Sequence, residues 1–161
     1  MGGIRESMEG LQELLHNDIL IAGVLSWFTA QVIKTILYAV LNKEIDFSRM
    51  IGDGGMPSAH SATVTAVAAM TGLTSGFGSP LFAVACIVAI IVMHDAMGVR
   101  LETGKQAKIL NEMVTLLEAL GQSKLSMEKK LKEFVGHTPT QVMAGMLLGI
   151  AVAAIYYFVF L

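Results

Sequence analysis

Four apolar stretches constrain the fold of this chain more than any other feature of its sequence. They cover residues 19–41, 57–74, 81–98 and 138–161. A helix needs about 20 apolar residues to cross a hydrocarbon core of about 30 Å. Only 15% of the residues are charged, whereas a soluble domain carries about 25%. The sequence therefore predicts an all-α, integral membrane helical bundle of about four transmembrane helices, forming a single domain over residues 1–161.

The region between the third and fourth apolar stretches is polar, and its apolar residues recur at helical spacing. Charged residues occupy the other faces, so the helices would be amphipathic. A Gly-Gln-Ser break at residues 121–123 divides the region into a longer and a shorter helix. We therefore expect a cytosolic amphipathic helical hairpin over residues 105–134, lying on the membrane surface or over the bundle.

Basic residues are distributed unevenly between the two ends of the predicted bundle. Of the 11 lysines and arginines, all but Arg5 and Lys34 lie in the loops at residues 42–56 and 99–136. Loops rich in lysine and arginine face the cytosol. The sequence thus predicts a multi-pass protein of the cell (plasma) membrane, with both large loops in the cytosol and both termini facing outward.

Charge and cysteine content argue against several kinds of function. A net charge of −2 at pH 7 provides no electrostatic basis for binding nucleic acid. Cys86 is the single cysteine and lies in an apolar run, so the chain has neither a disulfide framework nor a cysteine-based zinc motif. We accordingly expect neither a metal nor another cofactor.

A Gly-rich loop leads into the second apolar stretch. Gly54 and Gly55 would let the backbone turn and approach a ligand closely, and Pro57 fits the first turn of a helix. The start of a helix offers N–H groups and the positive end of its dipole, which suits phosphate. Ser58 and His60 would lie in or near that turn. The pattern is compatible with a phosphate cradle, and equally with a capped helix after a flexible loop.

Other polar residues fall at the same cytosolic level of the predicted bundle. Lys34 lies about 10 Å inside the first stretch and shares a helix face with Gln31. A lysine buried in the membrane faces a cavity, a partner or an anion. Alternatively, its long side chain extends to the nearby membrane surface. Asp95 and Arg100 end the third stretch, either as an interfacial ion pair or as site residues, and His137 precedes the fourth. Lysine and arginine can hold phosphate oxygens, and histidine can act as acid, base or nucleophile.

Three motifs at this level are specific when they are taken together. They are Gly54-Gly55-Met56-Pro57-Ser58-Ala59-His60-Ser61, Asp95-Ala96-Met97-Gly98-Val99-Arg100, and Gly136-His137-Thr138-Pro139 followed by Val142-Met143-Ala144-Gly145. With Gln31-Val32-Ile33-Lys34, they resemble the divergent type-2 phosphatidic acid phosphatase family, which is related to the vanadium-dependent haloperoxidases. The resemblance covers nearly the whole chain from about Ile19 onward.

The resemblance implies roles for these residues. His60 would be the general acid that protonates the leaving oxygen, and His137 would be the nucleophile that forms a phospho-histidine, which water then hydrolyses. The partners would be membrane lipids and a lipid phosphate substrate. The expected phosphate-binding residues are Lys34, Gly55, Ser58 and Arg100.

The chain departs from the pattern of the wider superfamily at the residue that orients the nucleophile. Gln141 stands where that superfamily has an aspartate; glutamine can accept a hydrogen bond from imidazole but carries no charge. Asp95 could substitute from another helix. The wider family also has six crossings, so four would make a minimal bundle that a homodimer could complete. Gly145 and Gly149 would allow close packing, either within the chain or between copies.

Together these features predict a metal-independent membrane phosphatase that hydrolyses a lipid phosphate or pyrophosphate monoester at the cytosolic leaflet. One alternative is a non-catalytic lipid-phosphate binder or transporter that keeps the cradle, because Gln141 is not a carboxylate. Another is a phosphotransferase that holds Mg²⁺ with Asp53, Asp95 and Glu102. The last is a purely structural membrane protein.

Overall fold

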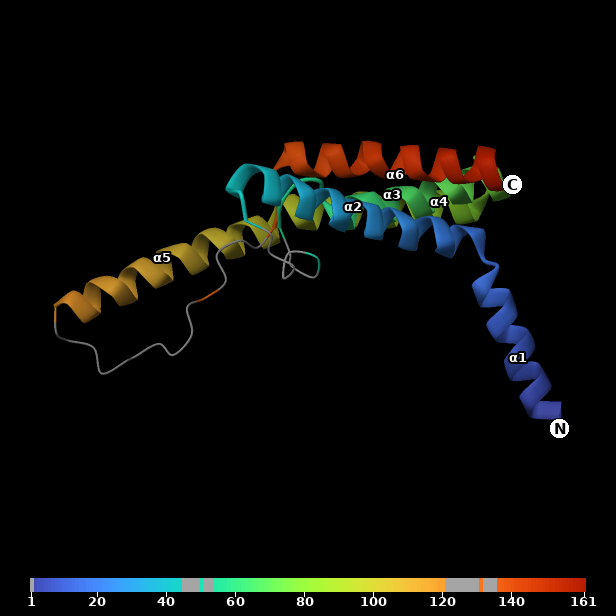
Figure 1. The fold of residues 1–161 in the computed structure, drawn as a ribbon, viewed down its shortest axis with the longest axis horizontal. Helices are drawn as coiled ribbons and strands as arrows, with labels where there is room; N and C mark the ends of the chain where they lie inside the picture. Colours follow the sequence, from blue (N-terminus) through green and yellow to red (C-terminus); the bar gives the residue numbers. More distant parts are fainter. Residues whose placement is uncertain (1, 45–49, 51–53, 121–130, 132–135) are drawn as a thin grey trace.

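The computed structural model describes residues 2–44, 50, 54–120, 131 and 136–161, and these ranges contain helices and no strand. The helices are α1 (Gly2–Leu15), α2 (Asp18–Asn42), α3 (Ala59–Ser75), α4 (Pro80–Met97), α5 (Val99–Ala119) and α6 (Pro139–Phe160). Figure 1 shows α2, α3, α4 and α6 side by side with alternating directions, while α1 and α5 leave the bundle at opposite ends. The predicted all-α helical bundle is confirmed.

The shortest bundle helix, α3, lies at the centre and packs against α2, α4 and α6. Apart from Met70, the side chains that it buries are small, and Ala62 and Ala66 are fully buried. Two glycines of α6 fit against this surface, because a Cβ atom at Gly145 or Gly149 would collide with the backbone of Ser58 or Ala62. The glycine face of α6 therefore packs within the chain, as small residues allow in membrane bundles.

Three stretches of the described chain are long and apolar enough to cross a membrane: Asp18–Asn42, Pro80–Leu117 and Pro139–Phe160. The predicted span at residues 57–74 corresponds to α3, whose 17 residues extend about 25 Å. Pro57 lies outside this helix, contrary to expectation, because Ser58 caps it and the helix begins at Ala59. Three candidate spans thus surround a shorter central helix, and these four helices together form the bundle. Both termini lie at one end of the bundle (Figure 1).

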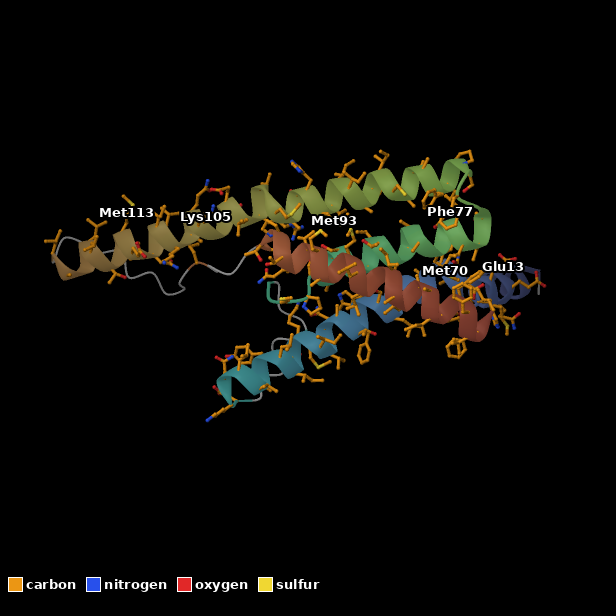
Figure 2. All side chains as sticks on the ribbon, turned by 90° about the horizontal axis from the view of Figure 1, so that it is seen from above. Glu13, Met70, Phe77, Met93, Lys105 and Met113 are labelled. Carbon is orange, nitrogen blue, oxygen red and sulfur yellow. The ribbon has the colours of Figure 1, made fainter. Side chains whose placement is uncertain are left out.

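The polar helix α5 follows α4 after a single interrupting residue, Gly98. The N–H of Gly98 donates to the carbonyl of His94 at 2.9 Å, and its carbonyl accepts the N–H of Glu102 at 3.0 Å. Figures 1 and 2 show α5 extending away from the bundle, so of the two expected positions, on the membrane surface or over the bundle, the second is wrong. The first arm of the predicted hairpin therefore begins at Val99 instead of residue 105, because helical hydrogen bonding resumes directly after Gly98.

The second arm of the predicted hairpin lies outside the described residues, apart from Leu131. Asn111 of α5 is 7% exposed, and its side chain makes two hydrogen bonds with the backbone of Leu131. Its Nδ2 donates to the carbonyl and its Oδ1 accepts the N–H, each at 3.0 Å. Leu131 therefore lies beside α5.

Candidate active site

A cavity of about 410 Å³ lies toward the end of the bundle from which α5 projects, where α3 and α6 begin beside the middle of α2. Its volume lies within the range of small-molecule sites. The structure brings three predicted site residues, Lys34, His60 and His137, to its wall, although they are distant in sequence. The full lining comprises Trp27, Gln31, Lys34, Gly54, Ala59, His60, Thr63, Val64, Val92 and His137.

Lys34 reaches this cavity from α2 and is only 6% exposed. Its Nζ donates to Oε1 of Gln31 at 2.8 Å, so the helix face shared by these residues points inward. Gly55 has φ of 83°, and a Cβ atom there would come within 3.1 Å of the Lys34 stem. Glycine at this position thus makes room for the lysine; the backbone of Gly54, rather than Gly55, lines the cavity.

The backbone of His137 is held by the junction between α4 and α5. Its N–H donates to the carbonyl of Ala96 at 2.9 Å, next to the break at Gly98. The preceding Gly136 has φ of 91°, and a Cβ atom there would collide with the backbone of Arg100 and Leu101. The position of His137 therefore depends on close contact with a junction almost forty residues earlier in the chain.

The ring of His137 is oriented by Gln141, one turn further along the chain. The Nδ1 atom of His137 lies 3.3 Å from Oε1 of Gln141, and the same oxygen accepts the backbone N–H of Thr138 at 3.1 Å. Because an amide oxygen can only accept, this contact fits the tautomer that carries its proton on Nδ1. In the neutral ring the lone pair then lies on Nε2, which makes that atom the basic and nucleophilic one.

His60 and His137 are neighbours across the cavity. Their ring centroids are 5.9 Å apart in an edge-to-face arrangement, and His137 is 2% exposed. Burial is the largest influence on the pKa of His137 and lowers it below its ordinary 6.5. The hydrogen bond to Gln141 raises the pKa, whereas the charges of His60 and Lys34 lower it further. A backbone hydrogen bond with Gly55 raises it slightly, and the net effect is a lowered pKa. His137 is therefore neutral at pH 7.

Ser58, a predicted phosphate ligand, is fully buried and does not line the cavity. Its Oγ accepts the N–H of Ser61 at 3.3 Å and the hydroxyl of Ser61 at 3.0 Å. Its own N–H donates to the backbone carbonyl of Gln141 at 3.0 Å. Ser58 thus caps α3 and ties the start of α3 to the start of α6, which brings the two cavity histidines together.

Asp95 and Arg100, which the sequence allowed either as an ion pair or as site residues, form an ion pair. Nε of Arg100 donates to Oδ2 of Asp95 at 2.9 Å, and the two side chains are 46% and 45% exposed. Neither lines the cavity. Of the two cationic side chains expected to bind phosphate, the structure brings only Lys34 to the cavity wall.

The described residues contain no group of three or more histidine, cysteine or acidic side chains that could hold a metal ion. Of the carboxylates considered for Mg²⁺, Glu102 instead accepts from Nζ of Lys105 at 2.6 Å and Asp95 pairs with Arg100. Asp53 lies outside the described residues. The geometry of the described chain therefore gives no support to the metal-dependent alternative.

Several residues that line the cavity were not predicted from the sequence, although the helical spacing of one of them could have revealed it. Trp27 precedes Gln31 and Lys34 by four and seven positions, so all three share one face of α2. The remaining missed residues, Thr63, Val64 and Val92, are ordinary apolar or small positions of membrane helices. Nothing in their local sequence separates them from residues that face lipid.

Comparison with known proteins identifies the family. The model of the divergent PAP2 family matches residues 15–152, and the chain belongs to this family. The uncharacterized membrane protein YuiD of Bacillus subtilis (strain 168) is 39% identical over 157 residues, which cover 92% of this chain and 99% of the relative. No solved structure matches the chain significantly. Together with the three spanning stretches, these findings establish a membrane protein of the divergent PAP2 family.

Proposed function

We propose that this protein is a membrane phosphatase that hydrolyses a lipid phosphate or pyrophosphate monoester through a phospho-histidine. The observation that carries the proposal is the pairing of His60 with His137 in a cavity that also holds the Lys34 ammonium group. Gln141 orients one of these rings through Nδ1. A cation, an oriented neutral imidazole and a second imidazole can together supply the charge stabilisation, nucleophile and acid of a metal-free phosphoryl transfer.

In the first step Nε2 of His137 attacks phosphorus. The nitrogen–phosphorus bond forms while the bond from phosphorus to the leaving oxygen breaks, and protonated His60 gives its proton to that oxygen. Lys34 stabilises the negative charge on the phosphoryl oxygens. The nucleophile must stand about 3 Å from phosphorus and the acid about 3 Å from the leaving oxygen. Rings whose centroids are 5.9 Å apart are close enough for both to contact one phosphate group.

In the second step water attacks the phospho-histidine. Neutral His60 takes one proton from the water as the new oxygen–phosphorus bond forms, and the nitrogen–phosphorus bond to His137 breaks. Phosphate leaves, and both histidines return to their starting states. His60 therefore acts first as an acid and then as a base, as microscopic reversibility of such two-step reactions requires.

We further propose that the cavity faces the cytosolic leaflet. The cavity lies at the end of the bundle from which α5 extends, and that end carries the loops with nearly all the lysines and arginines. The bias of basic residues toward the cytosol supports this orientation.

A non-catalytic lipid-phosphate binder is the second candidate, and the position of Arg100 favours it. The arginine side chain lies on the surface with Asp95, and Gln141 cannot stabilise an imidazolium by its charge. Such a protein would keep Lys34 and the two histidines as ligands for a phosphate headgroup, without turnover.

The test is phosphate release by the protein purified in detergent with EDTA, assayed on lipid phosphates and pyrophosphates. We expect His137→Ala to abolish release. His94→Ala is the matched control, because His94 lies on α4 outside the cavity lining. Radiolabelled phosphate from the substrate should appear on wild-type protein and not on His137→Ala. Substantial release by His137→Ala would overturn the mechanism, and binding without release by wild type would favour the second candidate.

A further inference from the structure

Two apolar hollows continue from the cavity along α3 into the membrane-spanning part of the bundle. One, of about 190 Å³, lies between α2 and α3. The other, of about 280 Å³, is walled mainly by α3 and α4. Trp27 and Thr63 line both the cavity and the first hollow, and Thr63 and Val64 line both the cavity and the second. The two hollows also share Val67. The cavity and the two hollows therefore adjoin one another along α3, and the three together are here called the α3 groove.

The α3 groove exists because its two walls pack on α3 and hardly on each other. Figure 2 shows α2 and α4 separating towards the end of the bundle that holds the cavity. The groove extends as far as Ile19 and Leu81, near the opposite end of the bundle. It is almost entirely apolar, and its wall residues Val84 and Val88 are 59% and 48% exposed. The groove is thus open sideways to the bilayer.

We infer that the α3 groove holds the hydrocarbon chain of the substrate lipid while its phosphate lies at Lys34, His60 and His137. This inference rests on the proposed function. The occupant follows from the continuity of the groove with the cavity, from its apolar lining, and from its position between two membrane-spanning helices. A lipid entering sideways from the bilayer keeps its chain in apolar surroundings and its phosphate at the polar end throughout.

The groove acts through positioning rather than through hydrophobic affinity. A hydrocarbon chain in the bilayer is already surrounded by apolar groups, so moving it into the groove yields little transfer free energy. Confining the chain does limit how the phosphate can approach Nε2 of His137, which is the effect that raises rates through orientation. The substrate class is therefore a long-chain lipid phosphate, and Thr63, Val67 and Val88 are positions that determine specificity.

Trp27 provides a direct test, because it is the single tryptophan of the chain and lies where the cavity meets the groove. The protein is placed in nanodiscs of unbrominated phosphatidylcholine. The probe is a nonhydrolysable phosphonate analogue of phosphatidic acid with bromine on the upper half of its chains, added at a low mole fraction. Bromine quenches tryptophan fluorescence only at close range, and phosphatidylcholine brominated at the same carbons is the reference.

We expect the phosphonate lipid to quench Trp27 at least twofold more than the reference lipid, and to do so saturably. Val88→Phe and Val84→Phe, which narrow the groove from its lipid-exposed wall, should remove this excess. Ile90→Phe is the matched control; Ile90 is 58% exposed on α4 but does not line the groove, so the excess should remain. Equal quenching by both lipids, or an excess that survives both valine substitutions, overturns the inference.

Phosphate release measured on the same preparations separates the two proposals. Excess quenching without hydrolysis of any lipid phosphate would overturn the catalytic proposal and support the groove. Hydrolysis with equal quenching by both lipids would support the catalytic proposal and overturn the groove. For an active enzyme, Val88→Phe should lower the ratio of kcat/KM for long-chain over short-chain substrates by at least tenfold, and an unchanged ratio would contradict the groove.

Discussion

Oε1 of Gln141 lies 3.3 Å from Nδ1 of His137 and also accepts the backbone N–H of Thr138. A single amide oxygen thus caps α6 and orients the imidazole next to the cap. The spacing of four residues makes this possible, because the histidine precedes the helix and the glutamine lies in its first turn. The orienting group is local in sequence, whereas the proposed general acid, His60, comes from another helix.

Replacement of Gln141 tests the orientation of the nucleophile. Gln141→Leu removes the acceptor, so we expect kcat to fall on the order of 10²-fold or more with little change in KM. The free energy of unfolding should fall by about 1 kcal/mol through loss of the hydrogen bonds. Gln141→Glu keeps an acceptor oxygen and should lose much less activity. Steady-state kinetics and thermal unfolding in detergent measure both effects, and equal activity of the two variants would contradict the assignment.

Lys34 should contribute to substrate binding. Lys34→Met keeps the stem that packs against Gly55 and removes the charge, so KM should rise about 10- to 100-fold, as expected for a charge-assisted hydrogen bond. The free energy of unfolding should fall by about 1 kcal/mol, because the hydrogen bond from Nζ to Gln31 is lost. Lys105→Met is the control, since Lys105 is paired with Glu102 at an exposed position. A KM equal to that of wild type would show that Lys34 does not contact the substrate.

Acid should reduce stability through His137. Burial lowers the pKa of His137 in the folded protein below 6.5, so the unfolded chain binds the proton more readily. The free energy of unfolding should therefore fall as the pH drops from 6.5 to the lowered pKa, and this contribution should level off below it. A histidine NMR titration, assigned with His137→Gln, measures the pKa directly. His137→Gln should lose this part of the pH dependence, and a His137 pKa above 6.5 would contradict the burial argument.

The contact between α6 and α3 should tolerate no added methyl group. Gly149→Ala places a Cβ atom against the carbonyl of Ala62, so we expect the free energy of unfolding to fall by about 1–3 kcal/mol through overpacking. The matched control is Gly10→Ala in α1, where a Cβ atom meets nothing within 4 Å. That substitution should be neutral or should stabilise by up to about 1 kcal/mol. Equal unfolding temperatures for the two variants would contradict the packing.

Much of the architecture could be predicted from local pattern. Long apolar runs identified the spanning helices, because backbone groups in a bilayer must be satisfied within a helix. The shared face of Gln31 and Lys34 followed from helical periodicity, and both residues do line the cavity. The sequence predicts that α3 begins at Pro57, because a proline suits the first turn of a helix. The helix begins at Ala59 instead, because Ser58 caps it through hydrogen bonds that residue spacing does not reveal.

The sequence by itself determined which segments are helical and apolar, and which residues could carry phosphate chemistry. Only the tertiary structure decided which of them meet. Arg100 and His137 belong to equally plausible motifs, yet the ion pair with Asp95 keeps the arginine on the surface while the contact with Ala96 places the histidine in the cavity. The reason is that hydropathy and periodicity act within one helix, whereas convergence depends on how small side chains let different helices pack together.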